Sequence, residues 1–336
     1  MRELRHDVWH SIRSDLAAGR PWLDRAVVLT FAVLTGLVVV GFTLLAEAAG
    51  KGFASIRQIG AIGHWLPLLW SPALAVLLLW WTRRHAWGAQ GSGIPQVLAV
   101  LNEQPFAADS SRLVSLRLSL QKIVLVSGGL LAGLSIGREG PTVQVGAGVM
   151  QHAHRWVSPR SGIDSHDLIV AGAAAGIAAA FNTPLGGVVF ALEQLSRRRS
   201  LSQSGLMIIS IVLAGLVAVS AFGNASYFGE IKVQALSWSL LFPGLLIGTV
   251  TGLCGGLFSR LIVLSTKGTP DRLSRWRAQY PLRFAAGCAF AVALIGIVDG
   301  GASTGAGYAP TRALLEGRSE LPAAPMLLSS CARRNR

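Results

Sequence analysis

Long apolar runs, separated by short charged stretches, dominate the chain. Each run is close to the length with which a helix crosses a bilayer, about 20 residues. The runs are Ala26–Ala49, Trp65–Thr82, Val114–Ile136, Leu168–Leu192, Gly205–Phe222, Ser239–Leu264 and Arg283–Val298. Because the lipid interior offers the backbone no hydrogen-bond partner, each run is predicted to be helical. The pattern predicts an all-α integral membrane protein that crosses the bilayer several times.

Composition supports this class and excludes an ordinary soluble domain. Of the 336 residues, 51% are hydrophobic and only 14% are charged, and the mean hydropathy is +0.51. The net charge of +14 does not indicate nucleic-acid binding, because basic residues such as Arg83 and Arg84 lie between apolar runs, as in cytoplasmic loops. We expect residues 1–25 to be a cytoplasmic amino-terminal segment, since they carry arginines and lack a signal-peptide core.

No metal site, cofactor or enzymatic chemistry is predicted. The three cysteines are too far apart for a metal-ligand spacing or a disulfide framework. His152, His154 and His166 lie near aspartates in a polar stretch, and we interpret them as solvated loop residues because no metal-ligand spacing connects them. An intramembrane hydrolase would need a nucleophile with a base, and Ser92 has no histidine partner deep in another apolar run.

Glycine and proline interrupt several of the apolar runs. The affected stretches are GSGIPQV, SIGREGPTVQVGAG, AGAAAGIAAAFNTPLGG and STGAGYAP. Such stretches are typical of interrupted helices whose ends point into the protein at membrane depth, and small residues also let helices pack closely. Close packing is the favoured interpretation for AGAAAGIAAA. It does not account for Ser92, Arg138 or Glu139, and charged residues at membrane depth usually mark a functional site.

The helix start predicted at GSGIP has the chemistry of an anion site. A helix amino terminus presents unpaired N–H groups and a partial positive charge, glycines let an anion approach the backbone, and the Ser92 hydroxyl adds a donor. Dipoles without a full charge bind weakly enough to let the ion leave. Glu139 lies at a second predicted helix start. It could occupy an anion position when ionised and vacate it when protonated, which predicts a gate; the alternative is a helix-capping acid paired with Arg138.

Three motifs occur in the order and near the spacing of the CLC chloride channels and proton/chloride antiporters. They are GSGIP at Gly91–Pro95, GREGPTVQVGA at Gly137–Ala147 and AAAGIAAAFNTPLGGVVFALEQL at Ala173–Leu195. The chain resembles this family from about residue 26 to residue 321. The resemblance implies an inverted-repeat fold of broken and re-entrant helices. It divides the transmembrane domain, residues 26–320, into a first repeat at about 26–222 and the start of a second at about 239–320.

The resemblance also implies roles for individual residues. Ser92 resembles the serine whose hydroxyl coordinates the central chloride ion, and a serine at this position favours chloride. Glu139 resembles the gating glutamate. The other residues of the two motifs would form the setting of the chloride site: Gly91, Gly93, Ile94, Pro95, Gly137, Arg138, Gly140 and Pro141.

Two further positions bear on the coupling of chloride movement to proton movement and on the electrostatic potential along the ion pathway. Antiporters of the family commonly carry a second glutamate as an internal proton relay, but FALEQ places Gln194 there. Because a glutamine cannot accept and release a proton near neutral pH, proton coupling is expected to be weakened, lost or rerouted, and a channel stays an alternative to an antiporter. Lys122, inside an apolar run, either raises the anion potential of the pathway or snorkels to the interface.

The carboxyl-terminal part departs from the family pattern. The family's second half contributes a GxFxP motif and a late tyrosine that contact chloride; neither is present, and residues 321–336 form a divergent basic tail. We therefore expect a truncated member, which would lack part of the family's homodimer surface. The predicted function is transport of chloride, with protons as a second ion, across the lipid bilayer of a bacterial inner membrane. The alternative is a non-conducting fragment that associates with full-length relatives.

Overall fold

The computed structural model of the chain describes residues 19–60, 62–102, 110–195, 205–223, 238–267 and 272–315. Regular structure in these ranges is helical throughout, which confirms the predicted all-α class. The elements are α2 (Gly19–Arg57), α3 (Pro67–His85), η1 (Trp87–Ala89), α4 (Ile94–Asn102), α5 (Ser110–Leu113), α6 (Leu116–Leu131), α7 (Glu139–His152), η2 (Ala153–Arg155), α8 (Ser165–Ala180), α9 (Pro184–Phe190), η3 (Ala191–Leu195), α10 (Gly205–Phe222), η5 (Trp238–Leu240), α11 (Leu241–Lys267), α12 (Arg272–Gln279), α13 (Pro281–Val298) and α14 (Tyr308–Leu315).

Helices α7 and α8 form the centre of the core. Nearly every residue of α8 is buried, and α7 is buried from Pro141 to Met150. The two backbones touch, since a Cβ atom on Gly146 would collide with the carbonyl oxygen of Gly172, and one on Gly176 with that of Thr142. Close approach of small residues therefore explains the alanine- and glycine-rich sequence of α8, as the packing interpretation expected.

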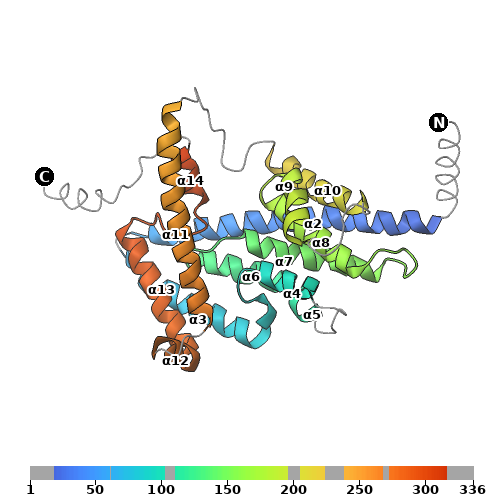
Figure 1. Ribbon diagram of the computed structural model, residues 1–336. Helices are drawn as coiled ribbons and strands as arrows, with labels where there is room; N and C mark the ends of the chain where they lie inside the picture. Colours follow the sequence, from blue (N-terminus) through green and yellow to red (C-terminus); the bar gives the residue numbers. More distant parts are fainter. Residues whose placement is uncertain are drawn as a thin grey trace, which may run out of the picture.

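The long helix α2 supports this core along one side. It has 39 residues, about 58 Å at 1.5 Å per residue, and packs against α6, α7, α8 and α10 (Figure 1). Buried Val28, Ala32, Val39 and Phe42 recur along its inward face. Its length exceeds the hydrocarbon thickness of about 30 Å, so part of α2 extends beyond the apolar layer or lies tilted in it.

Three of the seven predicted spans differ from the structure, and one of them is Trp65–Thr82, whose helix α3 is not among the stretches that are long and apolar enough to cross a bilayer. The run Leu168–Leu192 contains two helices, α8 and α9, joined by a turn at Asn182 with φ of 56° before Pro184. The run Val114–Ile136 contains α6, which ends at Leu131. Four helical stretches in the described ranges are long and apolar enough to cross a bilayer: Pro21–Arg57, Gly205–Phe222, Trp238–Leu264 and Pro281–Val298. An apolar run shows what faces lipid or core but does not show where the chain turns.

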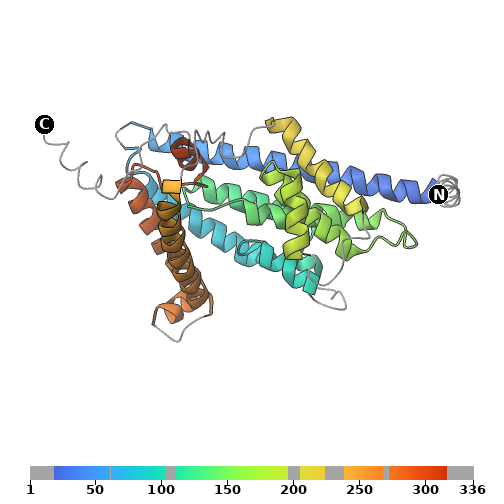
Figure 2. The ribbon, with the colours of Figure 1, turned by 45° about the horizontal axis from the view of Figure 1, so that its top comes forward.

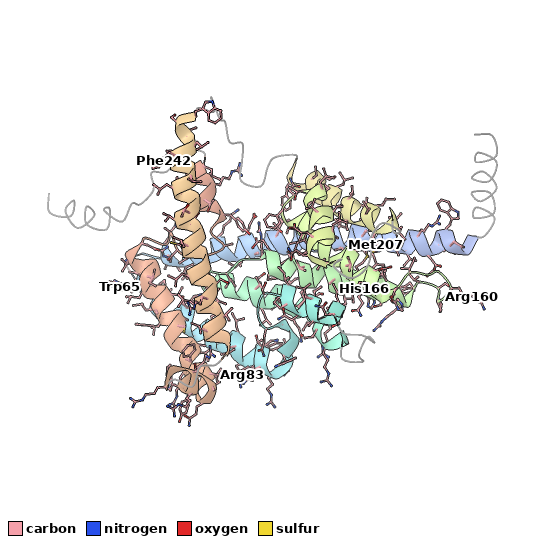
Figure 3. All side chains as sticks on the ribbon, in the orientation of Figure 1. Trp65, Arg83, Arg160, His166, Met207 and Phe242 are labelled. Atoms are coloured by element: carbon pink, nitrogen blue, oxygen red, sulfur yellow. The ribbon has the colours of Figure 1, made fainter. Side chains whose placement is uncertain are left out.

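Helix α11 lies at the edge of the molecule. None of its apolar stretch is buried, and Phe242 near its start is exposed to 73% (Figure 3). Turning the molecule shows α11 and α12 projecting away from the bundle of α2, α7 and α8 (Figure 2). Helix α13 instead packs against α3.

Candidate functional site: two helix starts that meet

The loop before α4 turns sharply at its two glycines. Gly91 and Gly93 have φ values of 72° and 114°, a region that side chains with a Cβ rarely adopt. Gln96 then caps the helix: its Oε1 accepts a hydrogen bond from the Gly93 N–H at 3.0 Å, and its amide donates to the carbonyl of Gln90. This arrangement resembles one half of a capping box. It holds Ser92 at the tip of the loop, where the side chain is exposed.

Lys122 stabilises the same loop through hydrogen bonds to its backbone. Its ammonium donates to the carbonyl oxygens of Ala89 at 2.8 Å and Gly91 at 2.6 Å, and the residue is only 1% exposed. Snorkelling to the interface is therefore wrong for this lysine. Its charge lies beneath the backbone that leads to Ser92, where two of its three donors are engaged by carbonyl groups.

Gln144 is a second buried support that the sequence did not identify. Its Nε2 donates to the carbonyl oxygens of Gly88 at 2.9 Å and Leu113 at 2.7 Å. The first bond connects α7 to η1, just before the Ser92 loop, and the second connects α7 to the end of α5. The sequence does carry a signal for this role. A glutamine among the valines and glycines of α7 is costly to bury unless it is hydrogen-bonded.

Glu139 is the first residue of α7. Its carboxylate turns back over Gly137, where a Cβ atom would lie 2.6 Å from Oε2. The Oε1 atom is buried without a hydrogen-bond partner. A carboxylate at this position is stabilised by the partial positive charge of the helix amino terminus. It lies where another anion would also be stabilised.

Arg138, one residue earlier, is turned toward α2. Its Nη1 donates to the carbonyl oxygen of Thr43 and to Oε1 of Glu47, both at 3.2 Å, and the residue is 3% exposed. Its guanidinium also lies over the ring of Tyr308, with Cζ 4.9 Å from the ring centroid. These contacts place Arg138 between α2 and the start of α14, where it fixes the chain that enters α7.

The starts of α4 and α7 lie against each other. A Cβ atom on Gly140 would overlap Oγ of Ser92, and one on Gly93 would lie 2.6 Å from the carbonyl oxygen of Gly140 and 3.1 Å from Cβ of Gln144. The structure thus brings together the Ser92 hydroxyl and the helix turn that begins with Glu139. The remaining predicted residues of both motifs occupy the same loops and first turns: Gly91, Ile94, Pro95, Gly137 and Pro141.

Gln194, the predicted relay position, lies in a different part of the fold. It belongs to η3, a π-helical turn that continues α9 and packs against α8, and it is half-buried while Glu193 is exposed. Such turns insert a residue into the helical register and are frequent at functional sites.

The histidines do not form a ligand cluster. The Nδ1 atom of His166 lies 3.6 Å from Oδ1 of Asp167, and the ring of His152 lies 6.1 Å from that of Phe31. Among the residues that the structure describes, no group of three or more histidine, cysteine or acidic side chains is placed to hold a metal ion.

Helices that break at membrane depth and start at a shared polar point are typical of membrane proteins that move ions. The sequence model of the voltage-gated chloride channel family matches residues 73–333, so the chain belongs to this family. The match continues past residue 321, where the resemblance noted in the sequence ends.

Named relatives agree with this family. The H(+)/Cl(-) exchange transporter ClcA of Vibrio vulnificus is 35% identical over 241 residues, which are 69% of this chain and 50% of the relative. The putative chloride channel-like protein CLC-g of Arabidopsis thaliana is 35% identical over 203 residues, 52% of this chain and 26% of the relative. The chain thus spans about half the length of the ClcA relative that it matches.

Solved structures of the family share the fold. A slow cyanobacterial Cl−/H+ antiporter superposes with a TM-score of 0.68 at 24% identity, covering 92% of this chain and 71% of that one. A CLC-type fluoride/proton antiporter superposes with a TM-score of 0.67 at 22% identity, covering 90% and 72%. At these identities the likeness establishes the fold and leaves the choice of ion to the residues of the site.

Proposed function

We propose that the chain moves chloride across a membrane, with the Ser92 loop and the first turn of α7 as its ion site and Glu139 as its gate. The observation that carries this proposal is the contact of Ser92 with Gly140, which places a hydroxyl donor beside the helix that starts with Glu139. The site has donors and helix dipoles for a small anion. Lys122, the buried cation nearby, is bonded to carbonyl groups of the loop.

The role of Glu139 as a gate follows from the repulsion between its carboxylate and a chloride ion. An ionised Glu139 and a chloride ion are both attracted to the amino terminus of α7. Two unit charges 4 Å apart repel by about 4 kcal/mol at an effective dielectric constant of about 20, which corresponds to roughly a thousandfold change in occupancy. Chloride therefore occupies this position when the carboxylate swings away or is protonated.

The proposed orientation places the amino terminus in the cytoplasm of a bacterium and the end of α2 outside its inner membrane. Arg83, Arg84 and His85 form the last turn of α3, which returns toward the cytoplasm in this arrangement. Basic residues at this end agree with the positive-inside rule.

Proton coupling is proposed to be weak. The ClcA relatives are named as H(+)/Cl(-) exchange transporters, but an amide at position 194 has no proton to exchange. The chain then carries chloride down its gradient with little proton movement, as a channel or as a poorly coupled antiporter.

Chloride efflux from liposomes tests the proposal. Liposomes containing the wild-type chain should release chloride faster than empty vesicles, and Glu139→Gln should change the rate and its dependence on pH. Glu193→Gln is the matched control, because it makes the same chemical change on an exposed part of η3. Equal rates and equal pH dependence for all three proteins would refute the gate.

A second candidate function is a non-conducting subunit that associates with a longer relative. The observation that favours it is α11, whose apolar stretch is wholly unburied and available to another helix. This candidate predicts chloride release no faster than from empty vesicles, together with co-purification of a co-expressed full-length relative. Flux through the chain alone would exclude it.

A further inference from the structure

A cavity of about 590 Å³ lies on the far side of Arg138 from the ion site. Its walls are the carboxyl-terminal part of α2, Arg138 itself, and the segment that runs from Gly301 into α14. Ser92 and Glu139 do not line it. The cavity is therefore adjacent to the proposed gate but separate from it.

Positive charge dominates the wall of this cavity. Among the residues that the structure describes, four cationic side chains line it, Lys51, Arg57, Arg138 and Arg312, and one acidic side chain, Glu47. A concave surface with low-dielectric walls concentrates the field of such charges and raises the local concentration of anions. Apolar groups, including Phe53 and Leu130, fill much of the remaining lining.

Two of the cations are held in fixed positions. Arg138 is buried and bonded to Thr43 and Glu47. Arg57 reaches across from α2 and donates to the carbonyl oxygen of Gly296 at 3.4 Å, and its guanidinium occupies the space where a Cβ of Gly301 would lie. Because the wall is pre-organised, an anion that enters it meets guanidinium groups that need little rearrangement.

Helix ends add to the positive potential. Arg138 is the N-cap of α7, and Tyr308, the first residue of α14, also lines the cavity. The amino termini of both helices therefore lie at the wall and contribute partial positive charge. The cavity combines these dipoles with full charges, unlike the neutral donors at Ser92.

The chemistry of the wall indicates the class of ligand. Guanidinium groups pair with the oxygens of phosphate or carboxylate groups through two parallel hydrogen bonds, a geometry that matches an oxyanion better than a spherical halide. Pockets for small molecules have volumes of about 300–1,000 Å³, and this one lies within that range. The residue Trp65, exposed to 59%, lies at the same end of the molecule (Figure 3), as expected at the level of lipid headgroups.

We propose that this cavity binds a phosphate-type oxyanion, supplied either as free phosphate or as the headgroup of an anionic phospholipid. Lys51 and Arg312 line the cavity and are exposed, so a ligand that enters from solvent can reach them. Basic pockets between membrane helices are suited to such headgroups. The proposal concerns binding and stands independently of chloride transport.

Calorimetric titration of the purified chain with inorganic phosphate tests the proposal. The double variant Lys51→Gln/Arg312→Gln should weaken phosphate binding by tenfold or more, since bonds to charged groups are each worth about tenfold. Arg160→Gln is the matched control, because this exposed arginine lies at the opposite end of the molecule (Figure 3). It should bind phosphate as the wild type does.

Glu47→Gln provides a test with the opposite sign. Removing this carboxylate, the one acidic group among the described residues of the wall, should tighten phosphate binding several-fold, which misfolding cannot imitate. Native mass spectrometry with phosphatidylglycerol and phosphatidylcholine then distinguishes the source: preferential retention of phosphatidylglycerol assigns the site to a headgroup, and its absence assigns it to free phosphate. Unchanged binding in the double variant, or displacement of phosphate by equimolar chloride, would overturn the assignment.

Discussion

Replacing Gly140 by alanine is the sharpest test of the contact between the two helix starts. The added Cβ would lie 2.9 Å from the carbonyl oxygen of Ser92 and 3.2 Å from its Cβ, and it would overlap Oγ. Favourable contacts between carbon atoms have separations of about 3.5–4.0 Å. The Ser92 loop must therefore move by roughly 0.5 Å or more, and it is held in place by Lys122 and Gln96.

The stability effects of this change oppose each other. Overpacking costs about 1–3 kcal/mol, whereas alanine is favoured over glycine in a helix by about 1 kcal/mol. The free energy of unfolding should thus fall by about 0–2 kcal/mol. In the proposed site, chloride affinity depends directly on the position of the Ser92 hydroxyl. Because the added Cβ would overlap the Oγ atom itself, the hydroxyl must move by roughly 1 Å, and misplacement of that size can cost a site about 100-fold; we expect a loss of affinity on the order of 100-fold.

Isothermal titration with chloride and thermal unfolding of the same samples would measure both effects. Gly41→Ala is the control, because it makes the same substitution on α2 at a position with no neighbouring atom within 4 Å. This control should keep the chloride affinity of the wild type. A folded Gly140→Ala variant that binds chloride as tightly as the control would refute the proposed site.

Two other substitutions test the support of the site and the relay position. Lys122→Met removes the donors to Ala89 and Gly91. It should lower the free energy of unfolding by about 1–3 kcal/mol, because the buried carbonyl group of Ala89 and the part-buried one of Gly91 lose their partner. Thermal unfolding, with the exposed Lys51→Met as control, measures this effect, and equal stability of the two variants would contradict it. Gln194→Glu should increase the pH change that a chloride gradient drives in liposomes, since a carboxylate can carry the proton. A pH-sensitive dye records this change, and wild-type liposomes that pump protons as strongly as the variant would show that Gln194 is not the relay position.

The sequence was sufficient to predict the helical membrane class and the glycine- and proline-bearing stretches that interrupt the helices, but not the residues at which each helix ends. Apolar runs mark α10, α11 and α13 closely, because each is a continuous helix with a wide lipid-compatible surface. The break between α8 and α9 lies inside an apolar run, where only Asn182 and Pro184 interrupt the pattern. Hydrophobicity reports the surroundings of a residue, whereas a turn depends on backbone conformation.

In the candidate site, too, the sequence predicted some features and not others. Helix-start signals and the family motifs singled out Ser92 and Glu139, and the family resemblance implied that they share one site. The contact of Ser92 with Gly140 is visible only in three dimensions. The partners of Lys122 and Gln144 are backbone carbonyl groups of distant segments. Any residue can supply a carbonyl oxygen, so no sequence pattern identifies such a partner.

The cap on α4 has a consequence for how firmly an ion can be held. The amide hydrogen of Gly93 already donates to Gln96. A halide bound at the loop would therefore have one backbone donor fewer than it would have without Gln96. A site in which every backbone amide could donate to the ion would hold the ion longer and release it more slowly. In the proposed site, Gln96 should therefore shorten the time for which an ion stays bound and so favour its release.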